Sequence, residues 1–191
     1  MLKVGITGGI GGGKSTFSEM LRTKGFLVYD TDKEAKRLQN NDMNLKKLII
    51  GEFGNNSYLN NELNRPYIAQ IVFNQPDMLK KLNDLVHPVV KRDILRWYSE
   101  NMDQKILFVE CAILYEGGFD TLTDKNILIT ASENIRIQRI INRDGLTIEQ
   151  IQSRIQNQLS DDYKKSRADF IIHTDKGLTI EMLDDIINQF N

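Results

Sequence analysis

The sequence has a single cysteine, few prolines and no long apolar run. Because Cys111 stands alone among 191 residues, the chain can build neither an internal disulfide framework nor a cysteine-based zinc site, as is typical of a reducing cytosol. The longest apolar stretches reach about five residues, far below the ~18 of a membrane span. Residues 2–6 follow the first Met without a basic segment that leads into a long apolar one. We therefore expect no signal peptide, no membrane partner and a cytoplasmic location.

An excess of charge of one sign is absent as well. Lys and Arg total 25 against 26 acidic residues, for a net charge of -1. Proteins that hold nucleic-acid phosphates usually carry a basic excess, so we expect no nucleic-acid partner, and no protein partner is evident. Hydrophobic residues make up 40% of the chain, which is enough for a full core at this length.

A glycine-rich segment near the N-terminus carries the strongest functional signal. Residues 8–15 satisfy the phosphate-binding pattern G-x-x-x-x-G-K-[ST], between an apolar strand and a helical pattern, so a plain glycine turn is the weaker interpretation. Glycines turn backbone N–H groups toward one anion and the helix adds its positive end, while Lys14 reaches phosphate and Ser15 binds Mg²⁺. No N-K-x-D guanine motif occurs, which disfavours a GTPase. The residues expected to bind ATP are Gly9, Gly11, Gly12, Gly13, Lys14, Ser15 and Thr16.

Two acidic residues follow predicted strands. Asp32 comes after the second strand, at the sheet edge where ligands of open parallel sheets bind, and its carboxylate is a candidate base for an attacking hydroxyl. Alternatively, residues 31–34 have the spacing of a capping box and only begin a helix. Glu110 ends an apolar strand, where an acid is costly unless paired, so we interpret it as a ligand of Mg²⁺.

The order of predicted elements indicates an α/β fold. Strands at residues 2–6 and 26–29 flank the glycine loop and its helix, which predicts a parallel βαβ unit. Three more short apolar segments, at 106–109, 126–129 and 170–172, complete a five-stranded parallel sheet with helices on both faces, as in P-loop kinases. We expect one domain over residues 1–191, whose nucleotide-binding core comprises about 1–32, 104–132 and 167–191.

Two insertions are predicted in this core. Residues 33–103 read mainly as helix and form the expected substrate subdomain, in which Pro88 should interrupt the last helix by disfavouring the helical conformation at His87. Residues 133–166 form the expected lid, read as two helices broken around Asp144-Gly145. Arg136, Arg139 and Arg143 share one stripe of its first helix, and they form either a solvated face or a clamp on ATP.

Taken in order, these segments resemble the dephospho-CoA kinase family over nearly the whole chain. Residues 6–16 are similar to that family's T-G-G-I-G-S-G-K-S-T, and Asp30-Thr31-Asp32 is similar to its D-A-D. The other similar segments are Asn64-Arg65, Leu85-Val86-His87-Pro88, Ile113-Leu114-Tyr115-Glu116, Gln138-Arg139, Arg143-Asp144, Arg154, Gln158 and Ala168-Asp169. The chain departs from the family at Glu110, where Asp is usual, and at His173-Thr174, where Asp-Asn is common.

The resemblance implies transfer of the γ-phosphoryl of ATP to the ribose 3′-hydroxyl of dephospho-CoA, giving CoA and ADP, with Mg²⁺ as cofactor and these two substrates as partners. It also implies that Arg136 is more expendable than the other two lid arginines. The residues that it assigns to catalysis are Asp32, Lys14, Arg139 and Arg143. Those that it assigns to the acceptor are Asp32, Arg65 and His87, and those assigned to the metal are Ser15 and Glu110.

Two other functions stay compatible with the residues. A nucleoside or nucleotide kinase would share the loop and the lid, but it would accept a substrate that lacks pantetheine. A regulator without catalytic activity would bind ATP and leave it intact.

Overall fold

The computed structural model describes residues 1–73, 75–156 and 158–190. The chain divides into two compact units, which are called here the sheet unit (Met1–Asp30 and Asn101–Asn191) and the helical unit (Thr31–Glu100). Within the described ranges, no helix is both long enough and apolar enough to cross a membrane.

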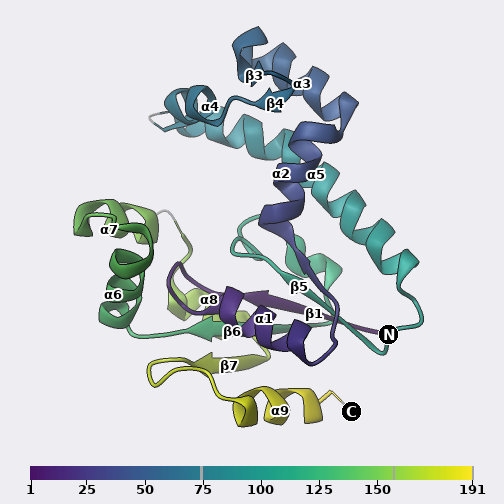
Figure 1. The fold of residues 1–191 in the computed structure, drawn as a ribbon, viewed down its shortest axis with the longest axis vertical. Helices are drawn as coiled ribbons and strands as arrows, with labels where there is room; N and C mark the ends of the chain where they lie inside the picture. The colour runs from purple at the N-terminus through teal and green to yellow at the C-terminus, as the bar shows by residue number, and fades with distance from the viewer. Residues whose placement is uncertain (74, 157, 191) are drawn as a thin grey trace. The chain divides into compact units, whose positions relative to one another are not determined.

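The sheet unit is built on one five-stranded parallel sheet, so the predicted fold class is confirmed (Figure 1). The strands lie in the order β2-β5-β1-β6-β7, with the first strand of the chain in the centre. In such a sheet all carboxyl ends meet at one edge, and the glycine loop after β1 lies at that edge. The strands are β1 (Leu2–Thr7), β2 (Val28–Asp30), β5 (Ile106–Glu110), β6 (Lys125–Thr130) and β7 (Phe170–His173).

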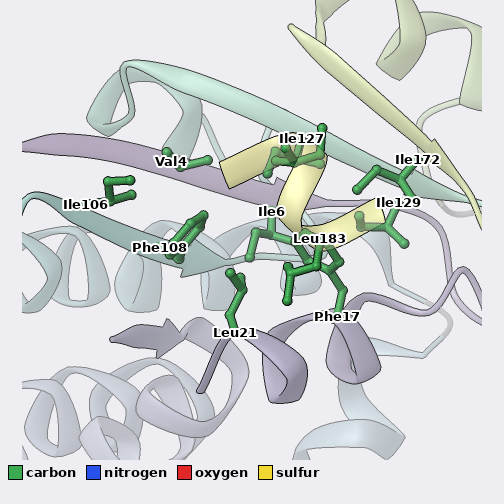
Figure 2. Close-up of a cluster of buried hydrophobic side chains, with 11 residues drawn as sticks. Val4, Ile6, Phe17, Leu21, Ile106, Phe108, Ile127, Ile129, Ile172 and Leu183 are labelled. Carbon is green, nitrogen blue, oxygen red and sulfur yellow. The ribbon is translucent and has the colours of Figure 1, made fainter. Parts of the chain in front are cut away.

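One face of this sheet carries the main hydrophobic core, beneath α1 (Lys14–Thr23) and α9 (Ile180–Asn188). Each fully buried Leu, Ile or Phe contributes roughly 1.5–3 kcal/mol to stability. This cluster therefore fixes α1, which begins directly after the glycine loop, against the sheet. Strand side chains alternate between faces, and α8 (Asp161–Arg167) packs against β6 on the opposite face. Figure 2 labels the core residues Val4, Ile6, Phe17, Leu21, Ile106, Phe108, Ile127, Ile129, Ile172 and Leu183.

Among its described residues, the segment between β6 and β7 contains three helices, whereas two were predicted. The expected break at Asp144-Gly145 is present, because α6 (Glu133–Asp144) ends at Gly145 in the left-handed conformation that glycine favours. After α7 (Ile148–Gln156), the additional helix α8 begins where the Ser160 hydroxyl accepts a hydrogen bond from the Tyr163 backbone N–H. This short helix shows too little apolar periodicity to be recognised from sequence.

The helical unit contains four α-helices, a short 3₁₀ segment and a two-stranded hairpin among its described residues. The Asp42 side chain caps α3 and the Asn64 side chain caps α4, so both starts follow the usual N-cap chemistry. The elements are α2 (Thr31–Asn41), α3 (Met43–Phe53), the 3₁₀ segment Asn55–Ser57, β3 (Tyr58–Leu59), β4 (Glu62–Leu63), α4 (Arg65–Val72) and α5 (Pro76–Glu100).

The predicted interruption at Pro88 is wrong. Helix α5 runs through Pro88 without a break, from Pro76 to Glu100. Proline inside a helix costs about 3 kcal/mol, but Val86, Val89 and Val90 around it are all buried. Burying three valines contributes roughly 1.5–3 kcal/mol each, so packing outweighs the local preference at His87.

Candidate active site

The glycine loop between β1 and α1 has the backbone conformation that its sequence predicts. Gly13 precedes α1 with a φ of 103°, and Gly11 has a φ of 77°, both in the region that favours glycine. A Cβ at Gly11 would also lie 2.7 Å from the Arg136 carbonyl oxygen. Because glycine adopts these φ values without strain, the loop can curl over the start of α1.

A pocket of about 360 Å³ opens beside this loop. The amino end of α1, Lys14 and two arginines of α6 surround it with positive charge, which suits a polyphosphate. Every lining residue belongs to the sheet unit. Six of the seven residues expected to bind ATP line the pocket, namely residues 11–16. The pocket is lined by Gly11, Gly12, Gly13, Lys14, Ser15, Thr16, Arg139, Ile140 and Arg143.

The Lys14 ammonium group bends back over the loop. Its Nζ donates hydrogen bonds to the carbonyl oxygens of Gly8 (2.8 Å) and Gly9 (3.3 Å). These neutral acceptors are weaker partners than an ionised phosphate oxygen. Lys14 therefore lies at the wall of the pocket, where a phosphate oxygen would be a stronger acceptor than either carbonyl oxygen.

Glu110 and Ser15 come together, as a shared metal site requires. The Ser15 hydroxyl donates a hydrogen bond of 2.9 Å to Glu110 Oε1. Glu110 is only 8% exposed, at the carboxyl end of the buried strand β5. Asp30 is its register partner on β2, so the two carboxylates lie on the same face of the sheet, the face that α1 covers.

These oxygens fit Mg²⁺ better than a soft metal. A hydroxyl and a carboxylate are the donors that Mg²⁺ accepts, together with phosphate oxygens and water. Across the described ranges, no group of three or more His, Cys, Asp or Glu side chains is arranged to hold a metal by itself. Such a site would bind the metal together with the nucleotide.

Arg139 and Arg143 both line the pocket but differ in their anchoring. Arg139 is half-buried, and it donates hydrogen bonds to the Gly11 carbonyl oxygen (3.3 Å), to the Thr174 hydroxyl (2.8 Å) and to the Thr174 carbonyl oxygen. Arg143 is exposed and forms an ion pair with its neighbour Asp144 at 2.8 Å. That neighbour raises the pKa of the Arg143 guanidinium further, so it stays charged. Arg139 is therefore anchored to the glycine loop and to Thr174, whereas Arg143 pairs with a residue of its own helix.

Arg136 lies outside the pocket lining, unlike Arg139 and Arg143, and its lesser importance for catalysis stays a prediction. It is 5% exposed and donates to both carboxylate oxygens of Asp161, at 3.1 and 3.2 Å. The Thr130 hydroxyl donates to the same carboxylate at 2.8 Å. A Cβ at Gly9 would collide with the Arg136 guanidinium at 2.2 Å. Arg136 therefore supports the back of the loop and does not line the pocket.

Sequence reasoning missed two contacts between the loop and distant segments. The Ile10 backbone N–H donates to Gln158 Oε1 at 3.0 Å, and the Thr174 hydroxyl donates to the Gly12 carbonyl oxygen at 2.8 Å. Gln158 was visible in the family resemblance and Thr174 only as a departure from it. Asp161 carried no signal in the sequence, because the helix that it begins was not predicted.

The remaining predicted site residues belong to the helical unit. Asp32 is exposed in the first turn of α2, two residues after β2 ends, and Arg65 is exposed at the first position of α4. Glu34 forms an ion pair with Arg37, so its carboxylate is engaged outside the capping-box pattern. His87 is half-buried in the middle of α5, where burial, with help from Lys91, lowers the pKa of its imidazole.

Comparison with known proteins gives a consistent result. Residues 2–179 match the family model described as dephospho-CoA kinase. A dephospho-CoA kinase from Porphyromonas gingivalis is 39% identical over 158 residues, which cover 83% of this chain and 78% of the relative. Among solved structures, a protein from Thermus thermophilus superposes with a TM-score of 0.82 at 30% identity, covering 98% of this chain and 95% of that one. A dephospho-CoA kinase from Campylobacter jejuni reaches 0.70 at 27% identity, with coverage of 98% and 96%.

Proposed function

The chain belongs to the dephospho-CoA kinase family, and we propose how its residues transfer the γ-phosphoryl of ATP to the ribose 3′-hydroxyl of dephospho-CoA, giving CoA and ADP. The observation that carries the proposal is the positively charged pocket between the glycine loop and the lid arginines, with the paired oxygens of Ser15 and Glu110 beside the same loop. These parts supply what phosphoryl transfer needs, which is position and charge stabilisation.

The loop and the arginines act on the phosphates. Backbone N–H groups of the loop hold the β-phosphate, and the Lys14 ammonium leaves its carbonyl partners for the more strongly accepting phosphate oxygens. Arg139, with Arg143 from the lid, neutralises charge that spreads over the transferring group. One such donor in a water-poor site contributes about 3 kcal/mol to transition-state stabilisation.

Ser15 and Glu110 would hold Mg²⁺. The chemistry that Mg²⁺ would supply there is partial neutralisation of the charge on the ATP phosphates. Glu110 is one methylene longer than the Asp usual in the family, and its carboxylate accepts a hydrogen bond from the Ser15 hydroxyl. The hydrogen bond between them supports this assignment, because two oxygens at 2.9 Å can share one small cation.

Asp32 is assigned to the acceptor side as the base that orients or deprotonates the ribose 3′-hydroxyl. Its carboxylate is exposed in the first turn of α2, where a substrate hydroxyl can reach it. We assign Arg65 and His87 of the helical unit to dephospho-CoA, where a guanidinium suits the pyrophosphate. The helical unit is then the substrate-binding subdomain, residues 133–166 are the lid, and the enzyme works in the cytoplasm on these two small substrates.

The experiment is a comparison of acceptors in a coupled assay of ADP release. Dephospho-CoA should support turnover, whereas adenosine and AMP should not. CoA itself is the matched control, because it keeps the pantetheine arm but has no free 3′-hydroxyl. A new phosphomonoester signal in the ³¹P NMR spectrum identifies the product. Equal rates with adenosine or AMP would favour a nucleoside or nucleotide kinase, and no turnover with any acceptor would favour an ATP-binding regulator.

A further inference from the structure

Thr174 follows β7 directly and is only 1% exposed, although it lies next to the loop pocket. Its hydroxyl donates to the Gly12 carbonyl oxygen at 2.8 Å and accepts from Arg139 Nη1 at 2.8 Å. Its carbonyl oxygen accepts from Arg139 Nη2, and its backbone N–H donates to the Thr130 carbonyl oxygen at 2.8 Å. One residue thus joins the glycine loop, the end of β6 and the lid arginine.

The hydroxyl of Thr174 is chemically suited to this bridge. A hydroxyl has one proton to donate and two lone pairs to accept with. Here the proton goes to Gly12, which leaves the lone pairs for the cationic Nη1 of Arg139. A valine of the same shape would leave both the Gly12 carbonyl and one N–H of Arg139 without this partner, in a buried place where unmet groups are costly.

The hydrogen bonds also determine which edge of Arg139 is left for a ligand. A guanidinium has five N–H donors, and the bonds to Gly11 and Thr174 use both on Nη1 and one on Nη2. The Nε–H and the second Nη2–H make no hydrogen bond to any other described residue. These two donors lie along one edge of the planar group, the geometry that binds two oxygens of a phosphate at once.

We propose that Thr174 is a positioning residue for phosphoryl transfer, which holds Arg139 against the glycine loop so that its remaining edge binds a phosphate of ATP. The proposal rests on the role assigned to Arg139 under the proposed function. The alternative is that Thr174 only closes the end of β7 and stabilises the fold. The two differ in prediction, because a positioning residue loses its effect once Arg139 is removed, whereas a structural residue does not.

The test is a double-mutant cycle in the full-length enzyme with Thr174→Val, Arg139→Gln and the double variant. We measure kcat and KM for ATP at saturating dephospho-CoA. Thr174→Val should lower kcat/KM for ATP about tenfold, the effect of one charge-assisted hydrogen bond, and leave KM for dephospho-CoA unchanged. Added to Arg139→Gln, it should lower kcat/KM by less than about twofold. Thr174→Ser, which keeps the hydroxyl, should restore activity to within about threefold of the parent.

A matched control removes a threonine hydroxyl far from the pocket. Thr123 precedes β6, at the amino edge of the sheet, and its hydroxyl donates to Asn126 Oδ1 at 2.8 Å. Thr123→Val should leave the kinetics for ATP unchanged. Thermal denaturation of every variant shows which of them are folded, and Thr174→Ala replaces Thr174→Val in the cycle if the valine variant does not fold.

Three results would overturn the proposal. Full additivity of the two substitutions in kcat/KM would mean that Thr174 does not act through Arg139. Parent-like kinetics for Thr174→Val would mean that the hydroxyl positions nothing. Parent-like kinetics for Arg139→Gln, with dephospho-CoA still phosphorylated, would instead remove the role assigned to Arg139 and this proposal with it. Loss of dephospho-CoA as acceptor in the parent enzyme would refute the proposed function itself.

Discussion

At the scale of single residues, a side chain speeds phosphoryl transfer when it stabilises the charge that develops on the transferring group. The Lys14 ammonium donates to two carbonyl oxygens at the wall of the pocket, and an ionised phosphate oxygen would be a stronger acceptor than either. Asp32 and Asp30 are two carboxylates separated by one residue, and Asp30 is additionally the register partner of Glu110. Their separate roles can be distinguished by substitution.

Lys14→Ala should lower kcat by about 10² or more, equivalent to roughly 3 kcal/mol, because the ammonium stabilises the transferring phosphoryl more than bound ATP. Steady-state kinetics and calorimetric titration with ATP measure the two effects separately. The control is Lys47→Ala, at an exposed position of α3. Parent-like turnover of Lys14→Ala would remove Lys14 from the mechanism.

Asp32→Asn should lower kcat by ~10²–10⁴ and leave the affinity for ATP unchanged, because the amide keeps the size of the side chain but cannot accept the proton. Asp30→Asn is the comparison, measured in the same assay. An inactive Asp30→Asn beside an active Asp32→Asn would mean that the other carboxylate is the base. Activity of both variants would mean that neither carboxylate is the base and that Asp32 only contributes to the start of α2.

At the scale of elements, α6 shows that one stripe of like charges can serve two purposes. Arg139 and Arg143 line the pocket, while Arg136 turns to Asp161 behind the loop. Arg136 and Arg143 are seven residues apart, nearly two helical turns, so small differences in direction place them in different surroundings.

Arg136→Gln should destabilise the protein by roughly 2 kcal/mol, below the 3–5 of a fully buried pair because the Asp161 side chain is 26% exposed. Arg143→Gln is its matched control and should change stability by less than about 0.5 kcal/mol, since that ion pair is in solvent. Urea unfolding followed by circular dichroism measures both. Equal stabilities would show that the Arg136–Asp161 pair does not support the loop.

Helix α5 should make stability depend on pH through His87. Burial, followed by repulsion from Lys91 and partly offset by Asp84, lowers the pKa of His87 below its usual 6.5. The unfolded chain then binds the proton more readily, so the stability from the neutral form is complete above pH 6.5 and is lost as pH falls through the lowered pKa.

Unfolding free energies of the parent and of His87→Gln, measured between pH 8 and pH 5, should therefore converge as the pH falls. The parent loses the contribution of neutral His87, whereas glutamine does not titrate. Parallel pH profiles for the two proteins would contradict this expectation.

At the scale of the whole molecule, the proposed function divides the substrates between the two compact units. Hydrogen exchange separates them, because a ligand slows exchange where it stabilises the folded chain. ADP should protect the loop and the start of α1 in the sheet unit. CoA, the product, should protect amides within residues 31–100. Protection by CoA confined to the sheet unit would contradict the assignment of Arg65 and His87 to the acceptor.

Much of this molecule follows from short stretches of sequence. The glycine loop, the apolar strands and the carboxylates after them were predictable, because a phosphate-binding pattern and a buried strand are each determined by neighbouring residues. The parallel sheet followed in turn, since a helix that connects two parallel strands crosses over with a right-handed turn in nearly all proteins. The meeting of Ser15 and Glu110, 95 residues apart, was predictable only because both sit where strands end at one edge.

The rest depended on tertiary contacts. Helical spacing placed three arginines on one stripe, but the choice of Arg136 as the buried one came from Asp161, 25 residues later. Pro88 lies in a helix because the valines around it are buried together. The dihedral preference of proline and its neighbour gives no sign of that burial. Thr174 touches the loop 162 residues earlier. Sequence patterns report the energies of neighbouring residues, whereas a buried charge or hydroxyl takes its partner from whichever segments the packed core brings beside it.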